Sequence, residues 1–142
     1  MPSGDLDPEV VTKIKSTIDE IIPALEEYEF KKAVDYAMFL VDYGNAYFQA
    51  NEPWKKIKTD KESCGAVLKN CLQIVKALAV LLEPVMPGKM QSAWNQLGIE
   101  GDVKDALFSD ATVPLKTGHQ LGVPEHLFNK MDKSEIKELD DI

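Results

Sequence analysis

The stretch "VLKNCLQIVKALAVLL", residues 67–82, decides the fold, because its apolar side chains cover more than half of a helical circumference. They recur at steps of three and four residues, as on a helix. The set is Val67, Leu68, Cys71, Leu72, Ile74, Val75, Leu78, Leu81 and Leu82. A helix that is apolar on most sides has to be surrounded by other elements. The stretch therefore predicts the central helix of a bundle.

Two amphipathic helices are predicted upstream of it. The first begins at Asp7 and Pro8, since Asp caps free N–H groups and Pro suits the first helical position. Its apolar stripe is Val11, Ile14, Ile18, Ile21, Ile22 and Leu25. Pro23 lies inside this stripe, so we expect it to kink the helix or to end it a turn early. The second helix follows from Phe30 and runs to about Ala50.

The predicted helix boundaries rest on proline and capping residues. Pro53 disfavours helical geometry at the residue before it, so residues 51–53 are expected to break the chain. Thr59 and Glu62 have the spacing of a capping box at the start of the central helix. Downstream, "GKMQSAWNQLG", residues 88–98, predicts a short fourth helix with Trp94 facing inward and Gly98 as its C-terminal cap.

The coarse organisation is that of one small helical domain. A chain of 142 residues is long enough for one core, and no alternating strand pattern is visible. We predict an all-α fold, an antiparallel four-helix bundle over residues 1–101. Residues 102–142 are broken by Pro114, Gly118, Gly122 and Pro124, and are expected to form an extended tail of the same domain that wraps the bundle.

No catalytic motif is found along the chain. His119 and His126 are the only histidines, and no cysteine lies near them, so no metal site is expected. Cys64 and Cys71 fit small core positions better than a disulfide, which favours a reducing, cytoplasmic setting. No apolar run has the length of a membrane helix, and no membrane association is expected. The chain itself is predicted to hold no catalytic residue and no cofactor.

The net charge of the chain restricts which macromolecules it can bind. The formal net charge of -8 argues against binding of nucleic acid over the whole surface. Lys55, Lys56 and Lys58 reverse that sign locally, around Trp54. Because most of the surface is acidic, a second function stays open, in which the chain is a non-enzymatic helical module that binds protein partners.

Three motifs carry a family resemblance that covers the whole chain. They are Tyr43-Gly44-Asn45-Ala46-Tyr47 with Glu52-Pro53-Trp54-Lys55, then "LQIVKALAVLLEPVMP" at residues 72–87, and "GHQLGVPEHLF" at residues 118–128. In this order and spacing the sequence resembles the anticodon-binding helical domain of methionyl-tRNA synthetase, especially its archaeal-type members. The anticodon domain of another class I synthetase, such as the leucine, isoleucine, valine or cysteine enzyme, is the alternative within the same architecture.

The resemblance implies a role for each matched residue. Trp54 would stack on the first base of the anticodon loop of methionine tRNA, and Pro53 would fix the direction of its indole. Asn45 and Tyr47 would support this loop, while Lys55, Lys56 and Lys58 would meet backbone phosphates. The full-length enzymes are ATP-dependent ligases, with ATP and Mg²⁺ in a catalytic domain that would be the partner of this one.

One departure from the family pattern affects the expected partners. The family's domain opens with a further helix, which carries an Asn and an Arg that read the anticodon, and no such helix precedes Pro8 here. We therefore expect the chain to be a C-terminal piece of a larger synthetase. The apolar surface left by the absent helix predicts self-association.

Overall fold

The computed structural model describes residues 4–132 and 134–135, and the regular structure within them is helical throughout. The helices are α1 (Pro8–Glu26), α2 (Phe30–Asn51), α3 (Pro53–Thr59), α4 (Lys61–Leu82) and α5 (Pro87–Gln96), followed by the 3-10 helices η1 (Val103–Asp105) and η2 (Phe108–Thr112). No strand occurs in this part of the chain. The predicted all-α fold is confirmed.

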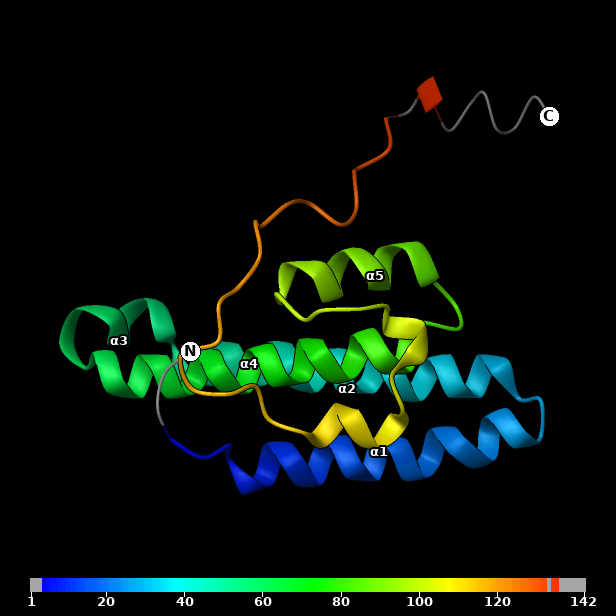
Figure 1. The fold of residues 1–142 in the computed structure, drawn as a ribbon, viewed down its shortest axis with the longest axis horizontal. Helices are drawn as coiled ribbons and strands as arrows, with labels where there is room; N and C mark the ends of the chain where they lie inside the picture. The colour runs from blue at the N-terminus through cyan, green and yellow to red at the C-terminus, as the bar shows by residue number, and fades with distance from the viewer. Residues whose placement is uncertain (1–3, 133, 136–142) are drawn as a thin grey trace.

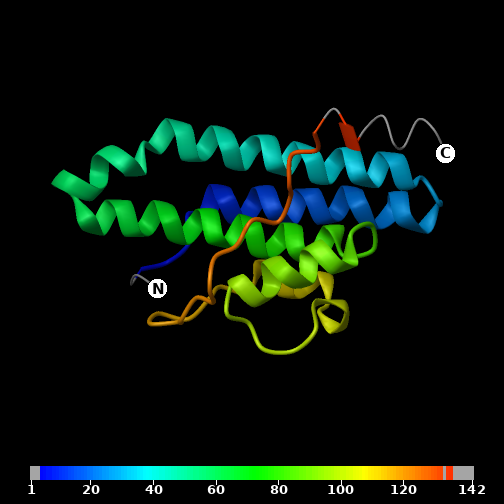
Figure 2. The same ribbon diagram turned by 90° about the horizontal axis from the view of Figure 1, so that it is seen from above.

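Three long helices form the core of the bundle. Helices α1, α2 and α4 lie side by side and alternate in direction (Figure 1). Helix α5 packs across the C-terminal half of α4 (Figure 2), and η2 packs against both α4 and α1. The short helix α3 closes one end of this arrangement, and the turn between α1 and α2 closes the opposite end.

Helix α1 begins as the sequence predicts and ends later. The Asp7 carboxylate accepts the N–H of Glu9 at 2.9 Å, and Pro8 is the first helical residue. Pro23 does not end the helix, which continues to Glu26, so of the two predicted outcomes the early end is wrong and the kink stays a prediction. Pro23 lies on the exposed side, where a carbonyl that loses its helical N–H partner can bind water. The buried positions are Val10, Ile14, Thr17, Ile21 and Ala24.

Helix α4 is the central element, as its pattern predicts. Most of its apolar residues are buried, Cys64 among them, and Cys71 is half-buried. By length and composition alone α4 could cross a membrane, because an 18-residue window of it has a mean hydropathy of 1.6. In the folded protein, however, 61% of that window is buried. Leu68 and Val75, both predicted to face the core, are 40% exposed, and Val75 lies between a hollow shared with α2 and another shared with α5 and residues 121–127.

The start of α4 differs from the predicted capping box. The residue that caps it is Asp60, whose carboxylate accepts the N–H of Ser63 at 3.0 Å. Thr59 is instead the last residue of α3, a separate helix where the sequence predicts only a break. The cap is therefore one residue later than predicted, which the sequence allows because Asp caps a helix at least as well as Thr.

The polar stripe of α4 binds the two extended segments of the chain. Two of these side chains bind the N-terminal segment: Lys69 donates to the Gly4 carbonyl, and Asn70 accepts the N–H of Asp7 at 2.9 Å. Farther along, Gln73 and Lys76 both donate to the Val113 carbonyl, at 3.2 and 2.8 Å. These side chains are buried because the backbone of both segments lies over them.

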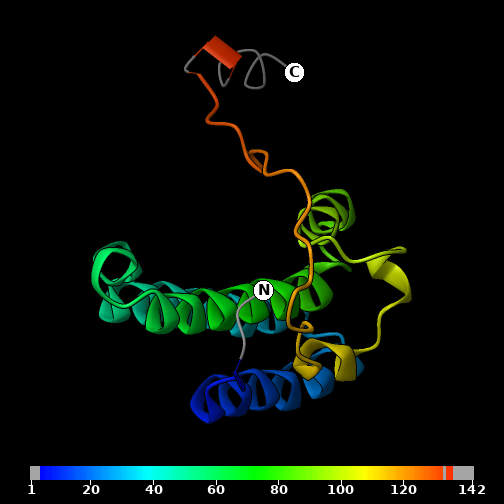
Figure 3. The ribbon, with the colours of Figure 1, turned by 60° about the vertical axis from the view of Figure 1, so that its left-hand side comes forward.

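The segment after α5 first packs on the bundle and then crosses it. Val103, Ala111 and Leu115 are buried, which anchors residues 103–115. The chain then passes the end of α5, where the N–H of Gly122 donates to the Gln96 carbonyl at 2.9 Å. Figure 3 shows the last described part running on past α5, away from α1. The predicted boundary between residues 101 and 102 stays a prediction, and residues 136–142 lie outside the described ones.

Candidate nucleic-acid interface

A sharp corner between α2 and α3 sets the position of Trp54. Glu52 adopts the left-handed conformation, with φ 44° and ψ 56°, and serves both as the C-cap of α2 and as the N-cap of α3. Its N–H donates to the Phe48 carbonyl at 3.2 Å, and its own carbonyl accepts the N–H of Lys55 at 2.9 Å. Pro53 follows as the first residue of α3. The predicted break is therefore a single residue, and it places Trp54 in the first turn of a new helix.

Pro53 is buried, and Trp54 beside it is not. The Pro53 carbonyl accepts a hydrogen bond from the Cys64 thiol at 3.4 Å, which ties the corner to α4. The Trp54 side chain is 44% exposed. Its ring lies 5.4 Å from that of Phe48, centroid to centroid, at an interplanar angle of 50°. Phe48 thus supports part of the indole and leaves the rest of it open to solvent.

Phe48 is the member of this site that the sequence motifs do not predict. Its spacing indicates only a place in the stripe of the second helix. The signal that could have found it is its position four residues before the break, one helical turn from the corner. Phe48 also lines a hollow of about 290 Å³ between α2 and α4, together with Asn45 and Cys71.

The structure places Asn45 and Tyr47 in different surroundings. Asn45 is exposed and lines the hollow that Phe48 also lines. Tyr47 is half-buried, 6.3 Å from the ring of Tyr43, and its carbonyl accepts a hydrogen bond from the Asn51 side chain at 2.9 Å. Burial, and after it the carboxylate of Asp7, raises the pKa of the Tyr47 hydroxyl. Asn45 is thus available to a partner, whereas Tyr47 belongs to the packing between α2 and the N-terminal segment.

The three predicted lysines all lie on α3 but differ in their contacts. Lys55 forms an ion pair with Glu52, with 2.7 Å between Nζ and Oε1. Lys56 is half-buried, and Lys58 is exposed. The pair of Lys55 with Glu52 lies in solvent, where such pairs contribute little to stability. All three ammonium groups are therefore carried by the same short helix as Trp54.

The remaining aromatic and histidine candidates lie away from this corner. Trp94, predicted as a core residue, is 5% exposed and confirms that prediction. The His119 ring nitrogen Nε2 lies 2.7 Å from the Leu97 carbonyl at the end of α5. Within residues 4–132 and 134–135, no three His, Cys, Asp or Glu side chains are grouped so as to hold a metal ion.

Comparison with known proteins places the chain in a family. A family model described as the anticodon binding domain of methionyl tRNA ligase matches residues 2–141. Among curated relatives, the methionine–tRNA ligases of Methanosarcina mazei and Methanosarcina acetivorans are each 48% identical over all 142 residues, and that of Methanothrix thermoacetophila is 47% identical over the same span.

The match covers the whole of this chain and a small part of each relative. It accounts for 20% of the two Methanosarcina ligases and 21% of the Methanothrix ligase. The chain thus spans about a fifth of the length of the curated relatives that it matches. Of the synthetase families that the sequence left open, the comparisons support the methionine one. The chain belongs to the family of anticodon-binding domains of methionyl-tRNA ligases.

Proposed function

We propose that this chain binds the anticodon loop of methionine tRNA, with the open face of Trp54 stacked on an anticodon base. The observation that carries the proposal is the half-exposed indole, supported by Phe48 on a corner fixed by Glu52 and Pro53. Base-to-aromatic stacking contributes about 1 to 3 kcal/mol per base. An indole held in place before binding loses less entropy than a mobile one.

The lysines of α3 supply the electrostatic part of the proposed contact. The net charge of -8 gives the protein as a whole a repulsive field for RNA, so the attraction has to be local. Lys58 is exposed beside Trp54, and Lys55 can exchange its Glu52 partner for a phosphate oxygen. Asn45 lies on one side of Phe48 and offers an amide to a base edge or a sugar.

The chemistry of the relatives would reside outside this chain. We propose that a ligase carrying this domain joins methionine to its tRNA in a catalytic region that uses ATP and Mg²⁺, and that it works in the cytoplasm. This domain would hold the anticodon while that region acts on the distant acceptor end. Its share of the reaction is binding and positioning.

Replacement of Trp54 by Ala tests the proposed function. In a ligase of the relatives' length that carries this sequence, W54A should lower kcat/KM for tRNA charging about 5- to 150-fold, the loss of about 1 to 3 kcal/mol of stacking. Methionine activation, measured by pyrophosphate exchange, should not change. The matched control is Leu107→Ala, which removes an exposed apolar side chain elsewhere. Equal charging by both variants would exclude Trp54 from the anticodon site and favour the protein-interaction alternative.

We also infer that the isolated chain self-associates through the partly exposed side of α4 that carries Leu68 and Val75. Leu68 and Val75 are exposed there, next to the hollow lined by Phe48 and Cys71. Contiguous apolar surface of this kind marks interaction sites. Light scattering of the isolated chain should report a dimer or larger species that Val75→Glu converts to a monomer. A wild-type chain that is monomeric at 100-fold higher concentration than a typical assay would refute the inference.

A further inference from the structure

Two residues other than glycine adopt a positive φ in the part of the chain that the structure describes, and they lie at opposite ends of the bundle. Tyr28, at φ 61°, stands in the turn between α1 and α2, and Glu52, at φ 44°, forms the corner before Trp54. A left-handed backbone is strained in a residue that has a Cβ, so Gly or Asn is usual at such positions. A strained residue of this kind points to a role for its side chain.

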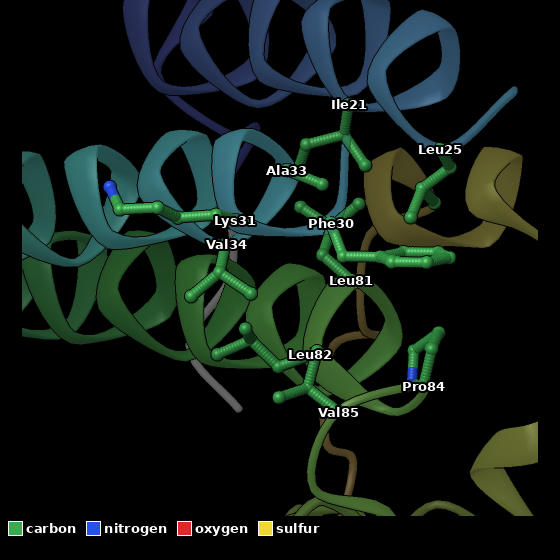
Figure 4. A pocket seen from close by; sticks show the side chains of 10 residues that line it. All are labelled: Ile21, Leu25, Phe30, Lys31, Ala33, Val34, Leu81, Leu82, Pro84 and Val85. Carbon is green, nitrogen blue, oxygen red and sulfur yellow. The ribbon is translucent and has the colours of Figure 1, made fainter. Parts of the chain in front are cut away.

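The side chain of Tyr28 has its role within the protein. Its ring lies 6.3 Å from that of Phe30 in an edge-to-face arrangement. Phe30 in turn lines an apolar hollow of about 550 Å³ between the ends of α1 and α4 and the start of α2 (Figure 4). Among the described residues of this lining Lys31 alone is charged, and it is paired with Asp35 at 2.7 Å. The strained residue at this end thus serves aromatic packing.

The side chain of Glu52 takes no part in capping either helix. The caps are made by its backbone, whose N–H donates to the Phe48 carbonyl and whose carbonyl accepts the N–H of Lys55. The carboxylate instead pairs with the Lys55 ammonium at 2.7 Å, with the two side chains 44% and 67% exposed. An ion pair this exposed contributes little to stability. Neither the caps nor the ion pair therefore explains a Glu at a position that suits Gly.

Stacking on Trp54 leaves the identity of a base unread. Every base has an aromatic face, so a stacking platform tolerates any sequence. The base edges do differ, because cytosine and adenine carry an exocyclic amino group, which donates, where uracil and guanine carry an oxygen, which accepts. A side chain that can only accept hydrogen bonds distinguishes these two classes of base.

Glu52 is the side chain of the candidate interface that can only accept. The lysines of α3 can only donate, whereas Asn45 and Tyr47 can both donate and accept. None of these side chains favours an amino group over an oxygen on a base. The Glu52 carboxylate does so, and it stands in the turn directly before Trp54.

We propose that Glu52 is a specificity-determining residue, whose carboxylate accepts a hydrogen bond from the exocyclic amino group of the base stacked on Trp54. The corner then favours cytosine or adenine at this place over uracil or guanine. In the free protein Lys55 is the partner of the carboxylate. On binding, Lys55 moves to a phosphate oxygen and Glu52 takes the amino group. This inference rests on the proposed function, because it needs a base on Trp54.

Glu52→Gln tests the assignment in a ligase of the relatives' length that carries this sequence. The Gln amide keeps the size of the side chain but can turn either an amino group or an oxygen to the base. Charging is measured as kcat/KM for four tRNAs that differ only in the first anticodon base. The cytosine-to-uracil and adenine-to-guanine ratios compare bases of equal ring size, so stacking largely cancels. Each ratio should fall about 10-fold or more in E52Q, since a hydrogen bond to a charged group is lost.

Lys55→Gln is the matched control, because it breaks the same ion pair and leaves the carboxylate in place. K55Q should charge all four tRNAs less well, through the lost phosphate contact, with both ratios as in the wild type. A purely structural disturbance of the corner would likewise lower charging of all four tRNAs by one factor. Unchanged ratios in E52Q, or an equal fall of the ratios in K55Q, would overturn the assignment of Glu52.

Trp54→Ala separates this inference from the proposed function. W54A should lower charging of all four tRNAs, because stacking is lost whichever base is present. If W54A lowers charging and E52Q keeps the wild-type ratios, the assignment of Glu52 alone is wrong. If W54A lowers charging of none of them, the anticodon role of the corner is wrong, and the assignment of Glu52 with it.

Discussion

The two tryptophans take opposite roles in the same bundle. Trp54 is 44% exposed, whereas Trp94 is 5% exposed. Each lies on a short amphipathic helix, but α3 packs mainly on α4, whereas α5 contacts both α4 and η1. Helix α5 therefore has two neighbouring elements and α3 has one main neighbour, which agrees with the lower exposure of Trp94.

The backbone leaves open space beside Trp54 and fills the space near Trp94. At the Trp54 corner one residue, Glu52, turns the chain and leaves the space beyond it open. Past Trp94 the tail crosses so close to α5 that a Cβ added at Gly98 would collide with the Gln120 carbonyl, and one at Gly122 with that of Asn95. The first region can accept a partner, and the second is already filled by the chain itself.

The largest expected effect is on stability, from truncation of the buried tryptophan. Trp94→Ala should lower the free energy of unfolding by about 3 to 5 kcal/mol, because it removes a large side chain from a packed core. Trp54→Ala should cost less than about 1.5 kcal/mol, since half of its side chain is already in water. Urea unfolding measures both losses. Similar losses for the two variants would mean that the two sites do not differ in packing as the structure shows.

The next effect concerns the crossing of the tail over α5. Gly98→Ala should lower the free energy of unfolding by about 3 kcal/mol. About 1 kcal/mol comes from the strain of a left-handed Ala and about 2 kcal/mol from displacement of the tail. The matched control is Gly118→Ala, because Gly118 has a similar positive φ, 78° against 69°, with no atom within 4 Å of an added Cβ. It should cost about 1 kcal/mol in urea unfolding. A Gly98 variant as stable as the Gly118 variant would show that the tail does not lie on α5 in solution.

Sequence patterns predict most of the helices and the core position of Trp94, and their success has a local cause. The helices follow from apolar side chains at steps of three and four, and the break before Trp54 follows from the restriction that Pro53 places on the residue before it. The core position of Trp94 follows from its spacing to Met90 and Leu97, which are also buried. Each of these inferences needs only residues that are near one another in the chain.

The features that the sequence does not predict depend on contacts between distant residues. Lys76 and Gln73 are buried because they bind the Val113 carbonyl, nearly forty positions away. Burial lowers the pKa of the Lys76 ammonium, and Asp110 partly opposes that effect. The periodicity of α4 gives no sign that an extended segment will cover its polar side. Support of Trp54 by Phe48 is likewise a consequence of the turn at Glu52, which no motif indicates.

The smallest expected effect concerns the backbone of the open corner, at Glu52. A β-branched residue is strained at φ 44°, so Glu52→Val should lower the free energy of unfolding by about 1 kcal/mol. Glu52→Gly should stay within about 0.5 kcal/mol of the wild type, because relief of strain offsets the greater entropy of the unfolded chain. Both variants lose the ion pair with Lys55, and Glu52→Gln measures that loss by itself. If Glu52→Val were as stable as Glu52→Gln in urea, the corner would not depend on a left-handed residue, and Trp54 would be held by its contact with Phe48 alone.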